Sequence, residues 1–112
     1  MPIELKLPII IRGSMEKFNQ MSHPGIILKR EFMNPYGITA YRLAKDAKID
    51  NMTVSEIIRG KRAITTKTAL KLAKYFGASE SYFINLQKEY DIRFIKNQIA
   101  EELEGIQTLR SA

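Results

Sequence analysis

Apolar residues recur every three or four positions along residues 23–104, which is the periodicity of amphipathic α-helices. The first predicted helix spans about residues 24–33 and begins with Pro24, because a proline needs no N–H donor in a first helical turn. A turn at residues 34–37 ends this helix, since Gly37 can adopt a positive φ. The side chains expected to face inward are Ile27, Leu28 and Phe32.

Two short helices are predicted next, and both have a polar residue at the start. Thr39 can cap a helix of about two turns, in which Leu43 and Ala47 share one face. Asp50 can cap the following helix, and Gly60 stands where a helix ends in a left-handed residue. The buried side of the second short helix is expected to consist of Val54, Ile57 and Ile58.

Two further helical regions are predicted in the second half of the chain. Thr65 or Thr66 begins the first region and Gly77 ends it, with a buried stripe of Leu70, Ala73 and Phe76. Ser79 is expected to cap the last region, which continues to about Glu104. This last region has two overlapping apolar stripes, Phe83-Leu86-Tyr90-Phe94 and Ile92-Ile95-Ile99-Leu103.

These two stripes hold more apolar surface than one edge of a small helical bundle can cover. Part of the region is therefore expected to contact a second copy of the chain, and we place the dimerisation region at about residues 79–104. The interface candidates are Phe83, Leu86, Tyr90 and Phe94.

The two short helices and the turn between them match the helix-turn-helix motif, here residues 39–60. With Ala40 as position one, Ala44 at position five is small because the second helix passes over it. We therefore expect an all-α, lambda-repressor-like helix-turn-helix fold of five to six helices with a long C-terminal helical region. The apolar positions that the motif requires are occupied by Leu43, Ala47, Ile49, Val54 and Ile57.

The second helix of this motif inserts its N-terminal end into the DNA major groove, so its outward side chains can reach base edges. The base-reading candidates are Asn51, Met52, Thr53 and Glu56. The phosphate-binding candidates are Thr39, Tyr41, Arg42, Ser55, Arg59, Lys61 and Arg62. The alternative is a surface helix that contacts only the DNA backbone.

Charge along the chain agrees with a nucleic-acid partner. The net charge is +6, and residues 25–75 hold eleven Lys and Arg against four Asp and Glu, a balance of +7. Residues 76–112 have a balance of −2. A solvated lysine-rich face would give the same composition, so charge alone leaves both interpretations open.

Composition excludes several other classes of protein. The chain has no Cys, which excludes a disulfide framework and a thiolate metal site and suits a reducing cytoplasm. No run of about 18 apolar residues is present, so no membrane contact is expected. The lone His23 precedes Pro24 and lacks ligand-spaced partners, so a role at the helix start is favoured over catalysis or metal binding. No catalytic residue, metal or cofactor is expected.

The first fourteen residues do not follow the helical pattern. Pro2 and Pro8 argue against a strand, and Arg12-Gly13-Ser14 before Met15 looks like a junction. We expect residues 1–14 to be a leader, vector-derived or an upstream extension, or disordered. Residues 15–112 are expected to form one domain.

The chain also resembles the HigA-type antitoxins within the Xre group of helix-turn-helix proteins. The most specific similarity lies in the His-Pro-Gly start, the Gly-Lys-Arg-x-Ile-Thr segment and the Asn-Leu-Gln-x-x-Tyr-Asp run. The resembling segments are HPGIILKREF (23–32), YRLAK (41–45), VSEIIRGKRAIT (54–65), TALKLAKYFGAS (68–79) and FINLQKEYDIR (83–93).

The resemblance implies a homodimer that binds double-stranded DNA at a palindromic operator, represses its own operon and neutralises a HigB/RelE-like mRNA-cleaving toxin. An orphan Xre-type transcriptional regulator with no toxin partner is the alternative.

Two departures from the family pattern affect these expectations. Many members have Gly where this chain has Lys48, and a left-handed Lys48 would carry about 1 kcal/mol of strain. Ala40 replaces the Gln that often contacts a phosphate, so that contact is expected from Thr39, Tyr41 or Arg42.

Overall fold

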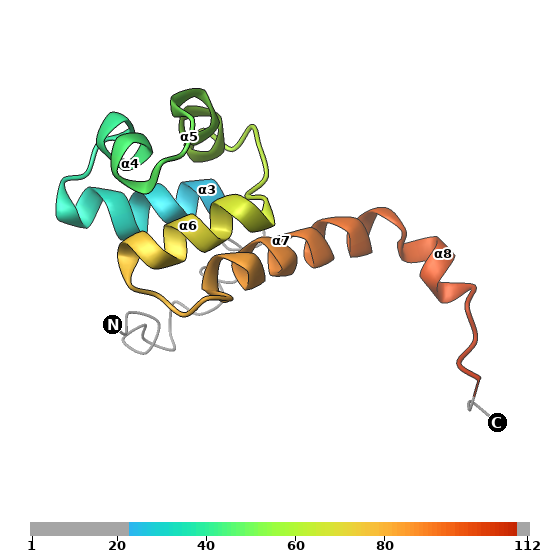
Figure 1. Cartoon of the computed structure of the whole chain (residues 1–112). Helices are drawn as coiled ribbons and strands as arrows, with labels where there is room; N and C mark the ends of the chain where they lie inside the picture. The colour runs from blue at the N-terminus through green and yellow to red at the C-terminus, as the bar shows by residue number, and fades with distance from the viewer. Residues whose placement is uncertain (1–22, 110–112) are drawn as a thin grey trace, which may run out of the picture.

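The computed structural model describes residues 23–109, which contain helices and turns but no strand (Figure 1). The predicted leader, residues 1–14, lies outside the described residues. In chain order the elements are α3 (Pro24–Ile27), η2 (Leu28–Met33), η3 (Asn34–Tyr36), α4 (Ala40–Ala47), α5 (Asn51–Ile58), α6 (Thr66–Phe76), α7 (Tyr82–Gln98) and α8 (Ala100–Glu104). The all-α helix-turn-helix fold expected from the sequence is confirmed.

The first helical stretch is less regular than the sequence pattern predicts. After one α-helical turn in α3, η2 is a π-helix, in which the hydrogen bonds span one residue more than in an α-helix. Met33, the last residue of η2, lies in the core, where it is 2% exposed. Leu28 is buried as predicted, whereas Ile27 and Phe32 are half-buried.

Gly25 allows α3 and α5 to lie against each other. A Cβ atom at this position would come within 1.7 Å of the carbonyl oxygen of Ile57, which no side chain can tolerate. The glycine of the His-Pro-Gly start is therefore required by helix packing.

Helices α4 and α5 form the predicted helix-turn-helix (Figure 1). Thr39 Oγ1 accepts a hydrogen bond from the N–H of Arg42 at 3.1 Å, which confirms Thr39 as the cap of α4. Gly60 has a φ of +77°, as expected for the end of α5. The apolar positions predicted from the motif spacing are all buried, namely Leu43, Ala44, Ala47, Ile49, Val54 and Ile57.

The predicted buried stripe of α6 is wrong at one position. Leu70 is 40% exposed, whereas Thr68, Ala69 and Leu72 are buried together with Ala73. Because α6 packs against both α4 and α7, its buried face is centred one residue earlier than Leu70. The start at Thr65 is confirmed, since its hydroxyl accepts from the N–H of Thr68 at 3.3 Å.

The last helical region also differs from the prediction at its start and near its end. Ser79 does not cap it, because the Ser79 carbonyl accepts from the N–H of Tyr82 in a tight turn and α7 begins only at Tyr82. A break at Ile99 then separates α7 from α8. Beyond its first turns, α7 extends away from the other helices, and α8 continues this arm (Figure 1).

Candidate nucleic-acid interface

The N-terminal turn of α5 is fixed by Asp50 and faces outward. Asp50 Oδ2 accepts from the N–H groups of Met52 and Thr53 at 3.1 and 3.3 Å, which confirms the predicted cap. Asn51 and Met52 are exposed, Met52 by 62%, while Thr53 is half-buried. These side chains therefore stand on a rigid helical turn that an approaching duplex can reach.

Glu56, the fourth base-reading candidate, already has a charged partner. Arg62 donates from Nη2 and Nε to Glu56 Oε1 at 2.6 and 2.7 Å. One carboxylate oxygen thus holds the guanidinium, and this ion pair ties the loop after α5 back to the helix. Sequence reasoning assigned the two residues to different groups and did not predict their pairing.

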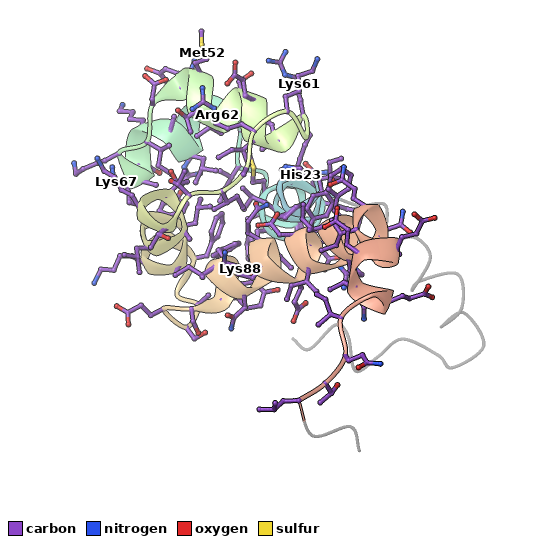
Figure 2. The ribbon with its side chains drawn as sticks, turned by 90° about the vertical axis from the view of Figure 1, so that its right-hand side faces the viewer. His23, Met52, Lys61, Arg62, Lys67 and Lys88 are labelled. Atoms are coloured by element: carbon purple, nitrogen blue, oxygen red, sulfur yellow. The ribbon has the colours of Figure 1, made fainter. Side chains whose placement is uncertain are left out.

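The cations of the loop after α5 lie at the same end of the molecule as the start of that helix. Figure 2 shows Met52 and Lys61 projecting from this end, with Arg62 nearby. Arg59, Lys61 and Arg62 are exposed, whereas Ser55 is half-buried. The structure therefore exposes these predicted cations, with Lys61 at the same end of the molecule as Met52 of the candidate base-reading turn (Figure 2).

The start of α4 provides the remaining phosphate-binding candidates. Tyr41 is 68% exposed, and Thr39 is also exposed. Arg42 Nε donates to Asp46 Oδ2 at 3.2 Å, and the Tyr75 hydroxyl donates to the same oxygen at 2.9 Å. These hydrogen bonds, first that of Tyr75 and then that of Arg42, lower the pKa of Asp46, and the bond to Asp46 raises the pKa of Tyr75.

The turn of the motif keeps its left-handed residue although that residue is Lys48. Its φ and ψ are 59° and 48°. In this left-handed conformation the Cβ atom crowds the following carbonyl oxygen, which costs about 1 kcal/mol that a glycine would avoid. The Lys48 carbonyl accepts from Lys71 Nζ at 2.6 Å. The α4–α5 geometry is therefore preserved without glycine, and the contact with Lys71 was not predicted.

His23 caps the first helix, as the sequence favoured. Its Nδ1 accepts from the N–H of Gly25 at 2.8 Å, and its ring lies 5.3 Å from that of Tyr90. Burial lowers the pKa of His23, and the nearby Asp91 opposes this effect. Within residues 23–109, no group of three His, Asp or Glu side chains is placed to hold a metal ion.

The dimer-interface candidates divide between the core and the surface. Phe83 was predicted at the interface, but this is wrong: its side chain is 0% exposed and its ring lies 5.1 Å from that of Phe32. Leu86 packs against the core, and Tyr90 is half-buried with its ring stacked 6.1 Å from Phe94. Phe94 itself is 52% exposed.

Most of the exposed apolar surface on the arm comes from the second predicted stripe. Ile92, Ile95 and Leu103 are 59%, 45% and 40% exposed.

No helix of the described part of the chain is both long and apolar enough to cross a bilayer.

Gln87 is a buried polar residue that sequence reasoning did not single out. It is 6% exposed, and its Oε1 accepts from the N–H of Ile64, which lies in the same loop as Lys61 and Arg62. The available signal was the Asn-Leu-Gln-x-x-Tyr-Asp run, in which this glutamine precedes Asp91 by one helical turn.

Comparisons with known proteins agree with this geometry. A helix-turn-helix family model matches residues 29–83, from the start of η2 to the start of α7. Virulence-associated protein I of Dichelobacter nodosus is 41% identical over 71 residues, which cover 63% of this chain and 66% of that protein. Antitoxin HigA-1 of Vibrio cholerae is 34% identical over 76% of this chain and 80% of its own length.

Among solved structures, Pseudomonas aeruginosa antitoxin HigA with the higBA promoter has a TM-score of 0.74 and 34% identity. The alignment covers 79% of this chain and 97% of that protein. A HigA-family addiction module antidote protein from Coxiella burnetii is 38% identical with a TM-score of 0.71, over 78% and 95% of the two chains. The cationic, outward-facing helix-turn-helix and these matches together show that the chain belongs to the HigA-type antitoxins of the Xre helix-turn-helix family.

Proposed function

We propose that this chain is a sequence-specific DNA-binding antitoxin that represses its own operon and neutralises a RelE-like mRNA-cleaving toxin. The observation that supports DNA binding most directly is the exposed, capped start of α5 beside the cations of the following loop. The similar HigA structure contains promoter DNA, which supports DNA binding by this chain. The function requires no catalysis by this chain.

In this proposal α5 enters the major groove with its N-terminal turn first. Asn51 and Thr53 can each donate and accept hydrogen bonds at base edges, and Met52 can pack against a thymine methyl group. Because Asp50 fixes the backbone of this turn, these side chains meet the bases without a prior rearrangement of the helix end.

In this proposal Glu56 has a different role from the other three base-reading candidates, Asn51, Met52 and Thr53. To accept a hydrogen bond from a cytosine amino group, it would have to share or release Arg62. We therefore assign Glu56 first to holding Arg62 toward the phosphate backbone, with base contact as a competing use of the same carboxylate.

Phosphate contacts would come from two places on either side of α5. Lys61, Arg62 and Arg59 supply positive charge from the loop after the helix, with Ser55 as a hydroxyl donor. At the start of α4, the Thr39 hydroxyl accepts from the Arg42 N–H and keeps its own hydrogen available for a phosphate. Tyr41 is free to donate from the same turn.

A homodimer would place two such helices on a palindromic operator, which increases the buried surface and the specificity. The exposed apolar side chains of α7 and α8 are the proposed source of this contact. Phe94 is the central candidate among them, because it is exposed and its ring is held by stacking on Tyr90.

The DNA-binding part of the proposal is tested by titrating the protein with a duplex taken from immediately upstream of its own coding sequence, against random duplex of equal length. Specific binding should exceed random binding by at least about 10³-fold at physiological salt. Equal affinity for the two duplexes would contradict an operator-binding function.

The antitoxin part is tested by co-expression with the neighbouring open reading frame. A small basic partner that co-purifies with this chain, and whose mRNA cleavage stops in the complex, is the expected result. If no neighbouring product binds the chain while operator binding persists, the chain is an orphan regulator instead.

A further inference from the structure

The loop between α5 and α6, residues 59–65, is held at its far end by a side chain of α7. The Ile64 N–H donates to Gln87 Oε1 at 2.8 Å, although 23 residues separate the two in the sequence. Both residues are buried, Ile64 at 4% and Gln87 at 6% exposed. Water therefore has little access to replace this bond if the glutamine is removed.

The orientation of the Gln87 amide is fixed by its second partner. Gln87 Nε2 donates to Asp91 Oδ1 at 2.9 Å. A backbone N–H can only donate and an ionised carboxylate can only accept, so the two partners permit a single orientation of the amide. Gln87 is therefore a rigid connection between α7 and the end of the loop.

The beginning of the same loop is held by α5. The Lys61 N–H donates to the Glu56 carbonyl at 2.8 Å, and the Arg62 guanidinium is paired with the Glu56 carboxylate. Lys61 and Arg62 thus form the first attachment of the loop, to α5, and Ile64 forms the second attachment, to α7.

We propose that Gln87 is a positioning residue for DNA binding, which holds the α5–α6 loop so that Lys61 and Arg62 face the phosphate backbone. Gln87 is buried on α7 and acts only through the loop. The inference rests on the proposed DNA-binding function and adds a contributor from outside the helix-turn-helix motif.

The first test replaces Gln87 by Met, which keeps an unbranched side chain of similar length but removes both hydrogen bonds. Gln87→Met should weaken binding to operator and random DNA by the same factor, about tenfold at 0.1 M salt if one cation no longer reaches its phosphate. The slope of log affinity against log salt should fall by about one unit. A residue with a merely structural role would lower Tm without changing this slope.

A rescue variant tests the hydrogen-bond geometry itself. In the double variant Gln87→Glu, Asp91→Asn, a carboxylate can accept from both the Ile64 N–H and the new amide, so wild-type affinity and salt slope should return. Gln87→Glu alone places two carboxylates side by side and should behave like Gln87→Met or worse. A double variant no better than Gln87→Glu would overturn the assigned geometry.

The matched control is Leu72→Val, a core change in α6 at a residue that is 1% exposed and makes no hydrogen bond to the loop. It should lower Tm and leave the salt slope unchanged. If Gln87→Met does not fold, Gln87→Leu, which also removes both hydrogen bonds, is measured in the same way.

The outcomes separate the two proposals. Wild-type protein that fails to prefer its operator contradicts the proposed function. Wild-type protein that binds its operator normally, while folded Gln87→Met or Gln87→Leu keeps the wild-type slope, overturns the positioning role alone.

Discussion

At the scale of single residues, the proposed DNA-binding face combines exposed side chains without a restraining partner and side chains held by neighbours. Asn51 and Met52 are exposed on a capped helical turn, whereas Glu56 and Arg62 restrain each other through an ion pair. Such a pair on the surface contributes little to stability, so its main effect is to limit where the guanidinium can lie.

Base contacts and phosphate contacts should respond differently to mutation. Asn51→Ala or Thr53→Ala should cost about 1–3 kcal/mol on the operator alone and leave the salt slope unchanged, because base edges carry the sequence information. Lys61→Ala or Arg62→Ala should weaken operator and random DNA alike and lower the salt slope by about one unit for each phosphate that is no longer neutralised. Titration of both duplexes at two salt concentrations distinguishes these cases. Equal losses on both duplexes for the Asn51 and Thr53 variants would mean that α5 does not read bases.

The protonation of His23 should make stability depend on pH. Burial lowers its pKa in the folded state below the ordinary value of 6.5, so the folded chain binds fewer protons than the unfolded chain. The neutral imidazole therefore makes its full contribution to the free energy of unfolding above about pH 6.5. This contribution is lost as the pH falls below that value toward the pKa of His23 in the folded state. Only the neutral ring can accept from the Gly25 N–H through Nδ1.

Thermal unfolding between pH 7.5 and 5 measures this effect. The variant His23→Asn retains a good capping side chain but does not titrate, so its Tm should vary less with pH than that of the wild type. His23→Ala should lose about 1 kcal/mol at pH 7.5 through the missing cap. Parallel pH profiles for wild type and His23→Asn would show that His23 does not titrate in this window.

At the scale of elements, the motif depends on contacts that hold α4 and α5 against the helices below them. Gly25 lets α3 approach the end of α5, and Phe83 anchors α7 in the same core. Both residues lie outside residues 39–60, so the motif is positioned by its surroundings as well as by its own apolar spacing.

Gly25→Ala should destabilise the domain by more than about 3 kcal/mol, because the added Cβ would overlap the Ile57 carbonyl unless the helices separate. Gly105→Ala is the matched control: a Cβ there meets the Glu102 and Glu101 carbonyl oxygens at an ordinary 3.5 and 3.8 Å, and its φ of −79° suits alanine. Urea unfolding of the two variants measures both effects. A Gly25→Ala protein as stable as wild type would contradict the close packing of α3 on α5.

At the scale of the whole molecule, the arm formed by the later part of α7 and by α8 is the least covered part of the described chain. The arm runs away from α4 and α5 (Figure 1), and it has exposed apolar side chains, so association through the arm would leave the proposed DNA-binding ends of both copies free.

The wild-type chain is expected to be a dimer at micromolar concentration, and Phe94→Glu should give monomers, because a charge would be buried at the contact. Phe94 is 52% exposed in the single chain, so the variant should still fold. Ala100→Glu adds the same charge at an exposed position that belongs to neither predicted stripe, and it should remain dimeric. Sedimentation of the three proteins decides this, and a monomeric wild type would contradict the predicted role of residues 79–104.

The sequence alone determined those features that rest on local interactions. Thr39 and Asp50 cap their helices, Gly60 ends one, and the apolar spacing of residues 39–60 places the correct side chains in the core. Each of these signals acts within a few residues, through a backbone hydrogen bond, a φ angle or the position of a side chain on a helix. Helix-turn-helix spacing and candidate DNA-binding residues could therefore be predicted.

Only the tertiary structure decided which apolar and polar side chains meet across elements. Phe83 and Leu70 are both apolar residues on helices, yet packing buries the first and exposes the second. The bond from Ile64 to Gln87 joins residues from different elements, and no periodicity predicts it. Burial and hydrogen bonding at these positions depend on how whole helices are oriented against one another, which a local pattern in one helix does not specify.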